Sequence, residues 1–193
     1  MGLDMYLYRK NYLDYDKKET IKEALGKEVY KKKLPEDFKL PEPLKEALEH
    51  IENCAEFDEE VAYWRKANMV HGWFVRNCES IREDIEIKVT YQDLVKLLED
   101  VNEVLENTVL VKGKVHIGTK FSGDKVEEEY ADGLIVKDSS VAEELLPTTE
   151  GFFFGSYDYN EYYIQDLKDT VEILNKIIKE SNEDDEFLYY ASY

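Results

Sequence analysis

Hydrophobic and polar residues alternate at both ends of the chain. Near the start, Leu3, Met5 and Leu7 alternate with polar and amphipathic residues, and this period of two predicts a strand over residues 2–9. The closing residues FLYYASY predict a second, aromatic strand. Two such strands would leave large apolar areas uncovered if they stayed apart, so we expect them to pair in one sheet.

Apolar stripes with the period of a helix fill much of the chain between these strands. Thr90 with Asp93, and Ser140 with Glu143, have the spacing of a capping box at a helix start. The stripe over residues 58–78 is apolar around most of its circumference, which places that helix in the middle of the core. Helices are predicted at residues 19–25, 43–54, 58–78, 91–107, 140–146 and 161–179, and about four of them should pack against the sheet.

The period of two returns at about residues 109–137. In this pattern Val115 and Ile117 share one face, and several lysines share the other. A Ser-Gly-Asp turn lies at 122–124, and the acids at 127–129 can pair with the lysines across the ladder. The pattern predicts an inserted β-hairpin.

Two short apolar runs complete the prediction of the fold. IEIKVT at 85–90 and the glycine-bounded GFFFG at 151–155 indicate further strands, the second buried on both faces. Asp158 or Asn160 is expected to cap the helix that follows. The whole predicts a single α+β domain over residues 1–193, with a mixed or antiparallel sheet that includes the N-terminal and C-terminal strands.

Composition limits the classes of function. The 193 residues include 43% hydrophobic residues, enough for a core, and carry a net charge of −19. This charge argues against direct binding to nucleic acid or to an anionic membrane, because phosphate binding needs lysine and arginine. With no apolar run near the roughly 20 residues of a membrane span and no signal peptide, we expect the chain to act in the cytoplasm.

One segment departs from the acidic character of the chain. Residues 63–77, YWRKANMVHGWFVRN, contain no acid although the chain has 44. On the predicted helix, Arg65, Asn68 and Arg76 share a stripe, with His71 and Trp73 beside it. Arginine offers a fork of donors to phosphate or carboxylate, and tryptophan offers a flat face to a ring. These residues predict a site for a small anionic, ring-bearing ligand such as a nucleotide.

A second anion-binding site is indicated at GFFFGSYDY, where the N–H groups of a helix N-terminus would lie beside Tyr157. The alternative interpretation of both segments is structural. The aromatic residues would then fill the core, and Arg65 and Arg76 would pair with acids from neighbouring elements. Asp4 would be either a general base or the partner of Arg65.

The sequence motifs of common enzyme classes are absent. There is no P-loop, no G-x-G-x-x-G after a strand, no H-E-x-x-H and no G-x-S-x-G. The histidines, His50, His71 and His116, are too scattered to indicate a metal site. We therefore predict neither a metal nor a cofactor, and enzymatic activity stays an open alternative.

Four blocks of the sequence carry a resemblance. At MGLDMYLYRK, YWRKANMVHGWFV, LLPTTEGFFFGS and FLYYAS the chain resembles a group of small uncharacterised proteins encoded by bacteriophages and prophages. The resemblance implies an accessory gene product that acts in the cytoplasm of an infected bacterium. Such proteins often counter host defences, some by sequestering nucleotide signals, and this is an analogy with other families. No functional residue is carried over from it.

Three hypotheses of function follow. The first is a non-catalytic binder of a small anionic ligand, and the second is an acidic module that imitates nucleic acid or inhibits a host protein. The third is an enzyme, which would require Asp4, His71 and Arg65 to converge in an open pocket. The surplus of aromatic residues is also compatible with a homodimer.

Overall fold

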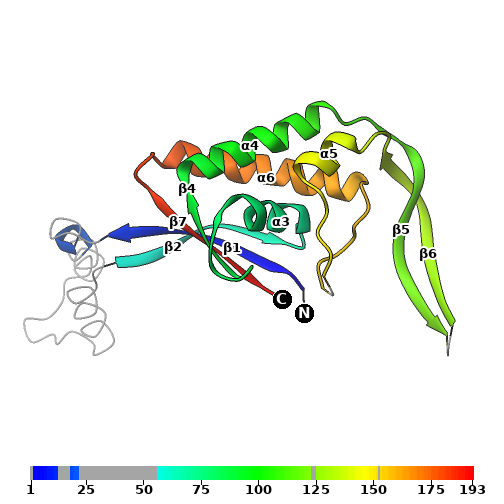
Figure 1. Cartoon of the computed structure of the whole chain (residues 1–193), viewed down its shortest axis with the longest axis horizontal. Coiled ribbons are helices and arrows are strands. Elements are labelled where there is room, and N and C mark those ends of the chain that lie inside the picture. Colours follow the sequence, from blue (N-terminus) through cyan, green and yellow to red (C-terminus); the bar gives the residue numbers. More distant parts are fainter. Residues whose placement is uncertain (1, 13–17, 22–55, 123–124, 152) are drawn as a thin grey trace, which may run out of the picture. The chain divides into compact units, whose positions relative to one another are not determined.

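The computed structural model describes residues 2–12, 18–21, 56–122, 125–151 and 153–193 (Figure 1). The chain divides into two compact units, Met1–Arg9 with Glu60–Tyr193, and Lys10–Glu59. Each unit is considered by itself, and the single domain over the whole chain stays a prediction. In the second unit, strand residues 10–12 and 56–59 and helical residues 18–21 are described.

Two predicted helices fall mainly outside these ranges. The helix predicted at 43–54 lies entirely outside the described residues, and so does most of the one predicted at 19–25.

The first unit is built on a five-stranded sheet in the order β2-β1-β7-β4-β3. Strands β1 and β7 are antiparallel and run in register from Asp4 opposite Ser192 to Arg9 opposite Phe187. Strand β7 also pairs antiparallel with β4, and β4 with β3. The predicted pairing of the N-terminal and C-terminal strands in an antiparallel sheet is confirmed. The strands are β1 Asp4–Tyr12, β2 Glu56–Arg65, β3 Glu79–Arg82, β4 Glu86–Thr90 and β7 Glu186–Ser192.

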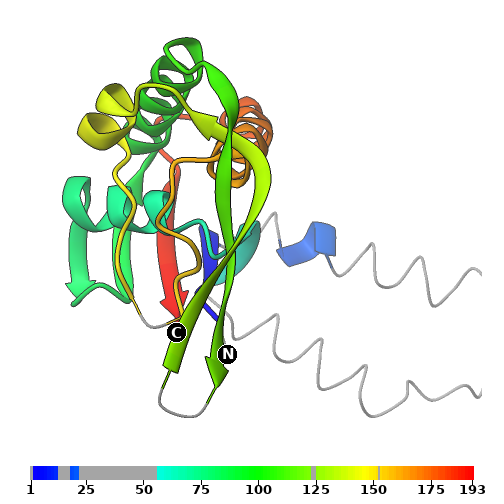
Figure 2. The same cartoon turned by 90° about the vertical axis from the view of Figure 1, so that its right-hand side faces the viewer.

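The alternation of residues gives the sheet one buried face. Met5 and Leu7 of β1 are fully buried, as are Ile87 and Val89 of β4, and Tyr189 of β7 joins them. Helices α4 and α6 lie together over the sheet in Figures 1 and 2. The four helices of this unit's described residues are α3 Asn68–Asn77, α4 Tyr91–Glu106, α5 Ser140–Leu145 and α6 Glu161–Glu180. The predicted α+β class is confirmed.

The starts of the helices follow the predicted capping residues in two of three cases. Thr90 and Asp93 form the predicted capping box of α4. Asn160 caps α6, because its Oδ1 accepts hydrogen bonds from the N–H groups of Tyr162 and Tyr163. For α5 the prediction was one residue off. Ser139, not Ser140, is the N-cap residue, and its hydroxyl donates to the Glu143 carboxylate at 2.5 Å instead of capping the backbone.

The prediction of one helix over 58–78 is wrong, because this stretch is a strand followed by a helix. In β2, Ala62 and Trp64 are buried while Tyr63 is 42% exposed, which is the alternation of a strand. Lys66 then takes a left-handed φ of 62°, which ends the strand before α3 begins. Since the first seven of the ten residues of α3 are buried, its placement in the core is confirmed.

The hairpin is present as β5 Leu110–Ser122 and β6 Lys125–Val136. One ion pair crosses the ladder, with Lys114 Nζ 2.7 Å from Asp132 Oδ1. Asp132 lies outside the acids at 127–129 that were expected to meet the lysines, and the pairing of those acids stays a prediction. The predicted common face of Val115 and Ile117 is wrong, since Val115 is buried and Ile117 is 59% exposed. A register shift between His116 and Gly118 interrupts the alternation there.

The GFFFG segment is not a strand in its described residues, 151 and 153–155. The Phe154 N–H donates to the Gly151 carbonyl at 3.1 Å, which closes a turn, and Gly155 has a φ of 94° that favours glycine.

Within the described ranges, no helix is both long enough and apolar enough for a membrane span.

Candidate functional site

A pocket of about 500 Å³ opens beside α3 in the first unit. Its walls come from four places in the chain: α3, the turn between β3 and β4, the loop after α5, and the end of β7. The residues that line it are His71, Gly72, Val75, Arg76, Asp84, Thr149, Glu150, Gly151, Phe154 and Tyr193.

The loop that forms one wall is fastened to α3 by Asn68. The side chain of Asn68 is 1% exposed, and its Nδ2 donates to the carbonyls of Phe154 at 3.1 Å and Ser156 at 2.8 Å. Its Oδ1 accepts from the Thr149 N–H at 3.0 Å. Tyr157 closes the loop on itself, because its hydroxyl donates to the Gly151 carbonyl at 2.6 Å and accepts from the N–H of the same residue. This wall is therefore held in place before any ligand arrives.

Gly72 allows the loop to approach the helix closely. A Cβ at this position would lie 2.0 Å from Thr149 Oγ1 and 2.8 Å from Arg76 Nη1. Both distances are far below van der Waals contact, so glycine is required for this packing. The same distances show that the Arg76 guanidinium lies against α3 near Thr149.

Arg76 is the cation of the pocket. Within the described part of the chain, no carboxylate oxygen lies within 4.0 Å of its guanidinium, whereas Arg65 has such a partner. Burial lowers the pKa of Arg76, and the neighbouring hydroxyls of Tyr159 and Tyr163 oppose that effect. An arginine keeps its charge even so. The lining also holds the carboxylates of Asp84 and Glu150, but neither lies within 4.0 Å of the Arg76 guanidinium, which is thus left with its donors available for an oxyanion.

His71 forms an uncharged wall of the pocket. Its ring packs edge-on against Phe154, with the ring centroids 5.2 Å apart, and its Nδ1 lies 2.9 Å from the Tyr189 hydroxyl. Burial lowers the pKa of His71 to about 4, although the charge of Asp84 opposes this shift. The imidazole is therefore neutral near pH 7 and acts as an aromatic and hydrogen-bonding group.

Of the six residues predicted as ligand-binding, two line the pocket, His71 and Arg76. Arg65 instead donates to Asp4 at 2.8 Å, which bears out the alternative that Asp4 is its ion-pair partner. Trp73 is 1% exposed and its Nε1 donates to Asp100 at 2.8 Å, so its ring lies in the core.

The roles of Asn68 and Tyr157 are those of fasteners. The Asn68 amide and the Tyr157 hydroxyl are both hydrogen-bonded to backbone groups of the loop, and neither residue lines the pocket. The grouping of Asp4, Arg65 and His71 that an enzyme hypothesis required is not found, because Asp4 and Arg65 do not line the pocket with His71.

Several lining residues gave no signal in the sequence. Asp84 lies in the turn Glu83–Ile85, and Glu83 takes a positive φ of 44° there. Phe154 was expected in a buried strand and lines the pocket instead, and Tyr193 packs on it with ring centroids 4.9 Å apart. The features that distinguish these two loops from other loops are the positive φ of Glu83 in the first and of Gly155 in the second.

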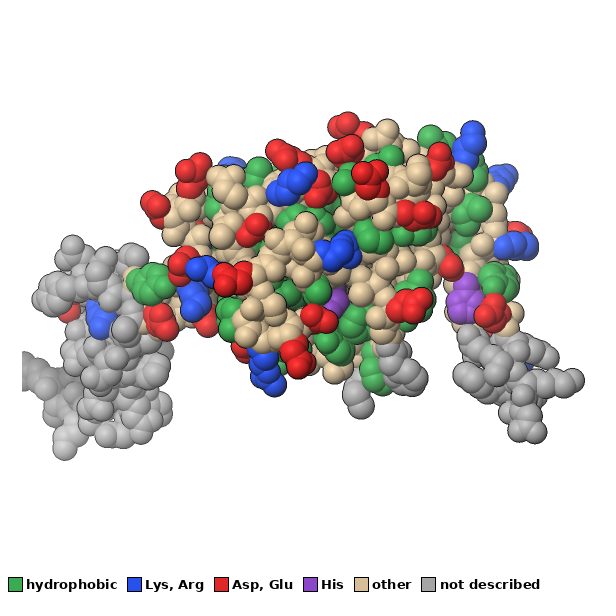
Figure 3. Space-filling model, viewed as in Figure 1, with side chains coloured by type: hydrophobic (Ala, Val, Ile, Leu, Met, Phe, Trp, Pro, Cys, Tyr) green, Lys and Arg blue, Asp and Glu red, His purple; other side chains and the backbone are tan. Residues whose placement is uncertain are grey.

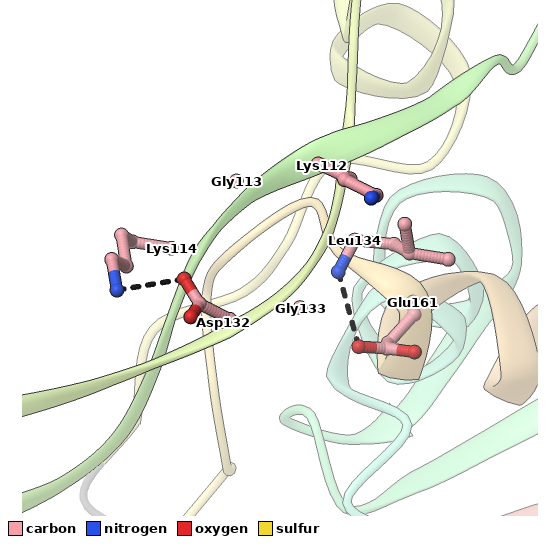
Figure 4. A pocket seen from close by; sticks show the side chains of 7 residues that line it. All are labelled: Lys112, Gly113, Lys114, Asp132, Gly133, Leu134 and Glu161. Carbon is pink, nitrogen blue, oxygen red and sulfur yellow. Dashed lines mark hydrogen bonds and ion pairs between the residues drawn. The ribbon is translucent and has the colours of Figure 1, made fainter.

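A second cavity, of about 790 Å³, lies at the base of the hairpin where it meets the start of α6 (Figure 4). Gly113 and Gly133 face each other across the ladder there. The charged groups around them are largely engaged: Lys114 pairs with Asp132, and Glu161 accepts from the Leu134 N–H at 3.1 Å. These contacts connect the hairpin to α6, and Lys112 is the remaining cation of the lining.

Other kinds of site find less support. Among the described residues, no three histidine, cysteine or acidic side chains converge as metal ligands would. An inhibitor that imitates nucleic acid needs a continuous acidic surface. On the face drawn in Figure 3, acidic side chains are scattered among lysines and arginines and leave no such surface there.

Comparison of the chain with protein-family models, with curated proteins and with solved structures finds no match.

Proposed function

We propose that the pocket beside α3 binds a small ligand that combines an anionic group with a ring, and that Arg76 binds the anion. The observation that carries this proposal is the guanidinium of Arg76, which lines the pocket with no carboxylate within 4.0 Å in the described residues. In a chain with 44 acids, an arginine left without such a partner favours an external one.

The rest of the lining suits the ring of such a ligand. Phe154, Tyr193 and the neutral His71 supply aromatic surface, and a volume of about 500 Å³ is in the range of small-molecule sites. The residues of the site are thus revised from the sequence-based expectation. Of the two arginines first assigned to the anion, Arg76 keeps that role, and Phe154 and Tyr193 take the role first assigned to the ring of Trp73.

In the setting implied by the resemblance to phage proteins, a non-catalytic binder of this kind would sequester a nucleotide in the host cytoplasm. The proposal includes no catalytic step.

Thermal unfolding in the presence of a panel of nucleotides and cyclic nucleotides tests the proposal. A ligand that binds the native state stabilises it by mass action, about 2.7 kcal/mol at a hundredfold excess over Kd. We expect at least one compound to raise the Tm, and Arg76→Met to abolish this shift without changing the Tm of the free protein by more than a few degrees.

Arg65→Met is the matched control, because Arg65 pairs with Asp4 outside the pocket. This variant should keep the shift. Equal loss of the shift in both variants, or no shift with any compound in the panel, would refute the proposal.

A further inference from the structure

The contact between His71 and Tyr189 determines which imidazole nitrogen carries the proton. The Tyr189 hydroxyl lies 2.9 Å from Nδ1, and both residues are buried. Among the described residues, this hydroxyl has no other hydrogen-bond partner. If Nδ1 were protonated, it would donate to the hydroxyl oxygen, and the hydroxyl proton would be buried without an acceptor. The hydroxyl therefore donates to Nδ1, and the neutral ring carries its proton on Nε2.

The other nitrogen, Nε2, opens to the pocket. It has no hydrogen-bond partner in the described part of the chain. The one buried side-chain polar atom found without a partner there is Asn160 Nδ2, so Nε2 keeps access to solvent. Because His71 lines the pocket, that access is through the pocket.

Packing prevents the ring from turning over and exchanging its two nitrogens. Phe154 stands edge-on to it, and Tyr193 does so from another side with ring centroids 5.9 Å apart. Tyr189 is itself held by Phe74, whose ring stacks on it at 4.5 Å. The orientation of the N–H group is thus set by neighbours that do not depend on a ligand.

We propose that Tyr189 fixes His71 in the tautomer protonated on Nε2, and that this N–H is an uncharged donor to the ligand whose anion Arg76 binds. The second part rests on the proposed function. A guanidinium and a neutral N–H are both donors, so the groups they recognise are oxygen acceptors of an oxyanion, a phosphate or a carboxylate. Tyr189 is a positioning residue in this arrangement, since it acts through His71.

Nitrogen-15 NMR of the full chain tests the tautomer directly and needs no ligand. Long-range proton–nitrogen correlations of the imidazole distinguish a protonated Nε2 from a protonated Nδ1. We expect the Nε2–H form in the unaltered protein, and a mixture of tautomers in Tyr189→Phe, which removes the hydroxyl and keeps the ring. A ring protonated on Nδ1 in the unaltered protein would overturn the proposal.

Titration with inorganic phosphate, acetate and adenosine 5′-monophosphate tests the donor role and distinguishes the sources of the oxyanion. His71→Gln keeps an N–H near the position of Nε2, whereas His71→Asn places its amide near Nδ1. We expect Tyr189→Phe and His71→Asn to weaken binding roughly three- to tenfold, the effect of one neutral hydrogen bond, and His71→Gln to stay within about twofold.

The outcomes separate this inference from the proposed function. If Arg76→Met abolishes binding while Tyr189→Phe and His71→Asn bind like the unaltered protein, the donor role is refuted and the function stands. If the unaltered protein binds none of the three compounds and no member of the nucleotide panel, the proposed function fails and the donor role with it. The NMR result then still decides the tautomer.

Discussion

Replacing Asn68 by alanine should loosen the wall of the pocket, because this side chain alone makes three hydrogen bonds to the loop. The carbonyl of Phe154 belongs to a residue that is 5% exposed, so leaving it without a donor costs roughly 1–3 kcal/mol. The bonds to Ser156 and Thr149 lie nearer to solvent, where water can replace the amide, and each contributes about 0.5–1 kcal/mol. The expected loss in the free energy of unfolding is therefore about 3 kcal/mol.

Urea denaturation followed by tryptophan fluorescence measures this loss, since Trp64 and Trp73 are both buried in the first unit. Asn77→Ala is the matched control, because Asn77 is an exposed residue of the same helix whose amide donates only to the Trp73 carbonyl at 2.8 Å. It should cost less than about 1 kcal/mol. Hydrogen exchange at the Thr149 amide should accelerate in Asn68→Ala alone. Equal losses in the free energy of unfolding for the two variants, with unchanged exchange at Thr149, would refute the role of Asn68 in holding the loop.

Three further predictions concern the same region. The pKa of His71 is about 4 in the native protein against 6.5 ordinarily, so the unfolded state binds the proton more readily. The stability that follows from this difference is complete above pH 6.5 and falls by up to about 3 kcal/mol as the pH drops to about 4. His71→Gln should make the urea midpoint less dependent on pH over that window. If the midpoints of the unaltered protein and of His71→Gln ran parallel with pH, the lowered pKa of His71 would be contradicted. Trp73→Phe should cost about 1.5–3 kcal/mol by removing the bond to the Asp100 carboxylate, yet leave the affinity for any ligand of the pocket unchanged; a loss of affinity at unchanged stability would return Trp73 to the site. Gly72→Ala should destabilise the protein because its Cβ would lie 2.0 Å from Thr149 Oγ1, and Thr149→Ala in the same chain should restore much of the loss; additive costs measured in a double-mutant cycle would contradict this contact.

The fold was predictable from the sequence where one face of an element meets the core. The strands at both ends of the chain and α4 with its capping box show a single clear period. The hairpin was predictable as an element, but its register shift between His116 and Gly118 was not. The error over 58–78 has a physical cause. The buried residues of β2 are followed at once by a helix that is buried along most of its length, so the apolar pattern continues across the break. Lys66 takes the left-handed conformation there, and a glycine or asparagine at this position would have marked it.

The candidate site was predictable only in part. Arg76 and His71 come from the segment 63–77, which stands out in the sequence because it contains no acid, and the structure places both at the pocket. Asp84, Thr149 and Tyr193 come from distant parts of the chain, and no local pattern indicates which loops will meet. Nor could charge alone show which arginine is left for a ligand, because that depends on Asp4 forming an ion pair with Arg65 and not with Arg76.

The central place of β7 in the sheet has a consequence for how the protein is made. Strand β7 lies between β1 and β4, and Asp4 pairs with Ser192, so the interior of the sheet joins residues from opposite ends of the sequence. During translation β1 and β4 emerge long before their shared neighbour, and each then presents an unpaired edge to the crowded cell. The sheet of this unit can therefore close only after β7 has been synthesised, and folding should be slow for its size because these contacts join residues far apart in the sequence.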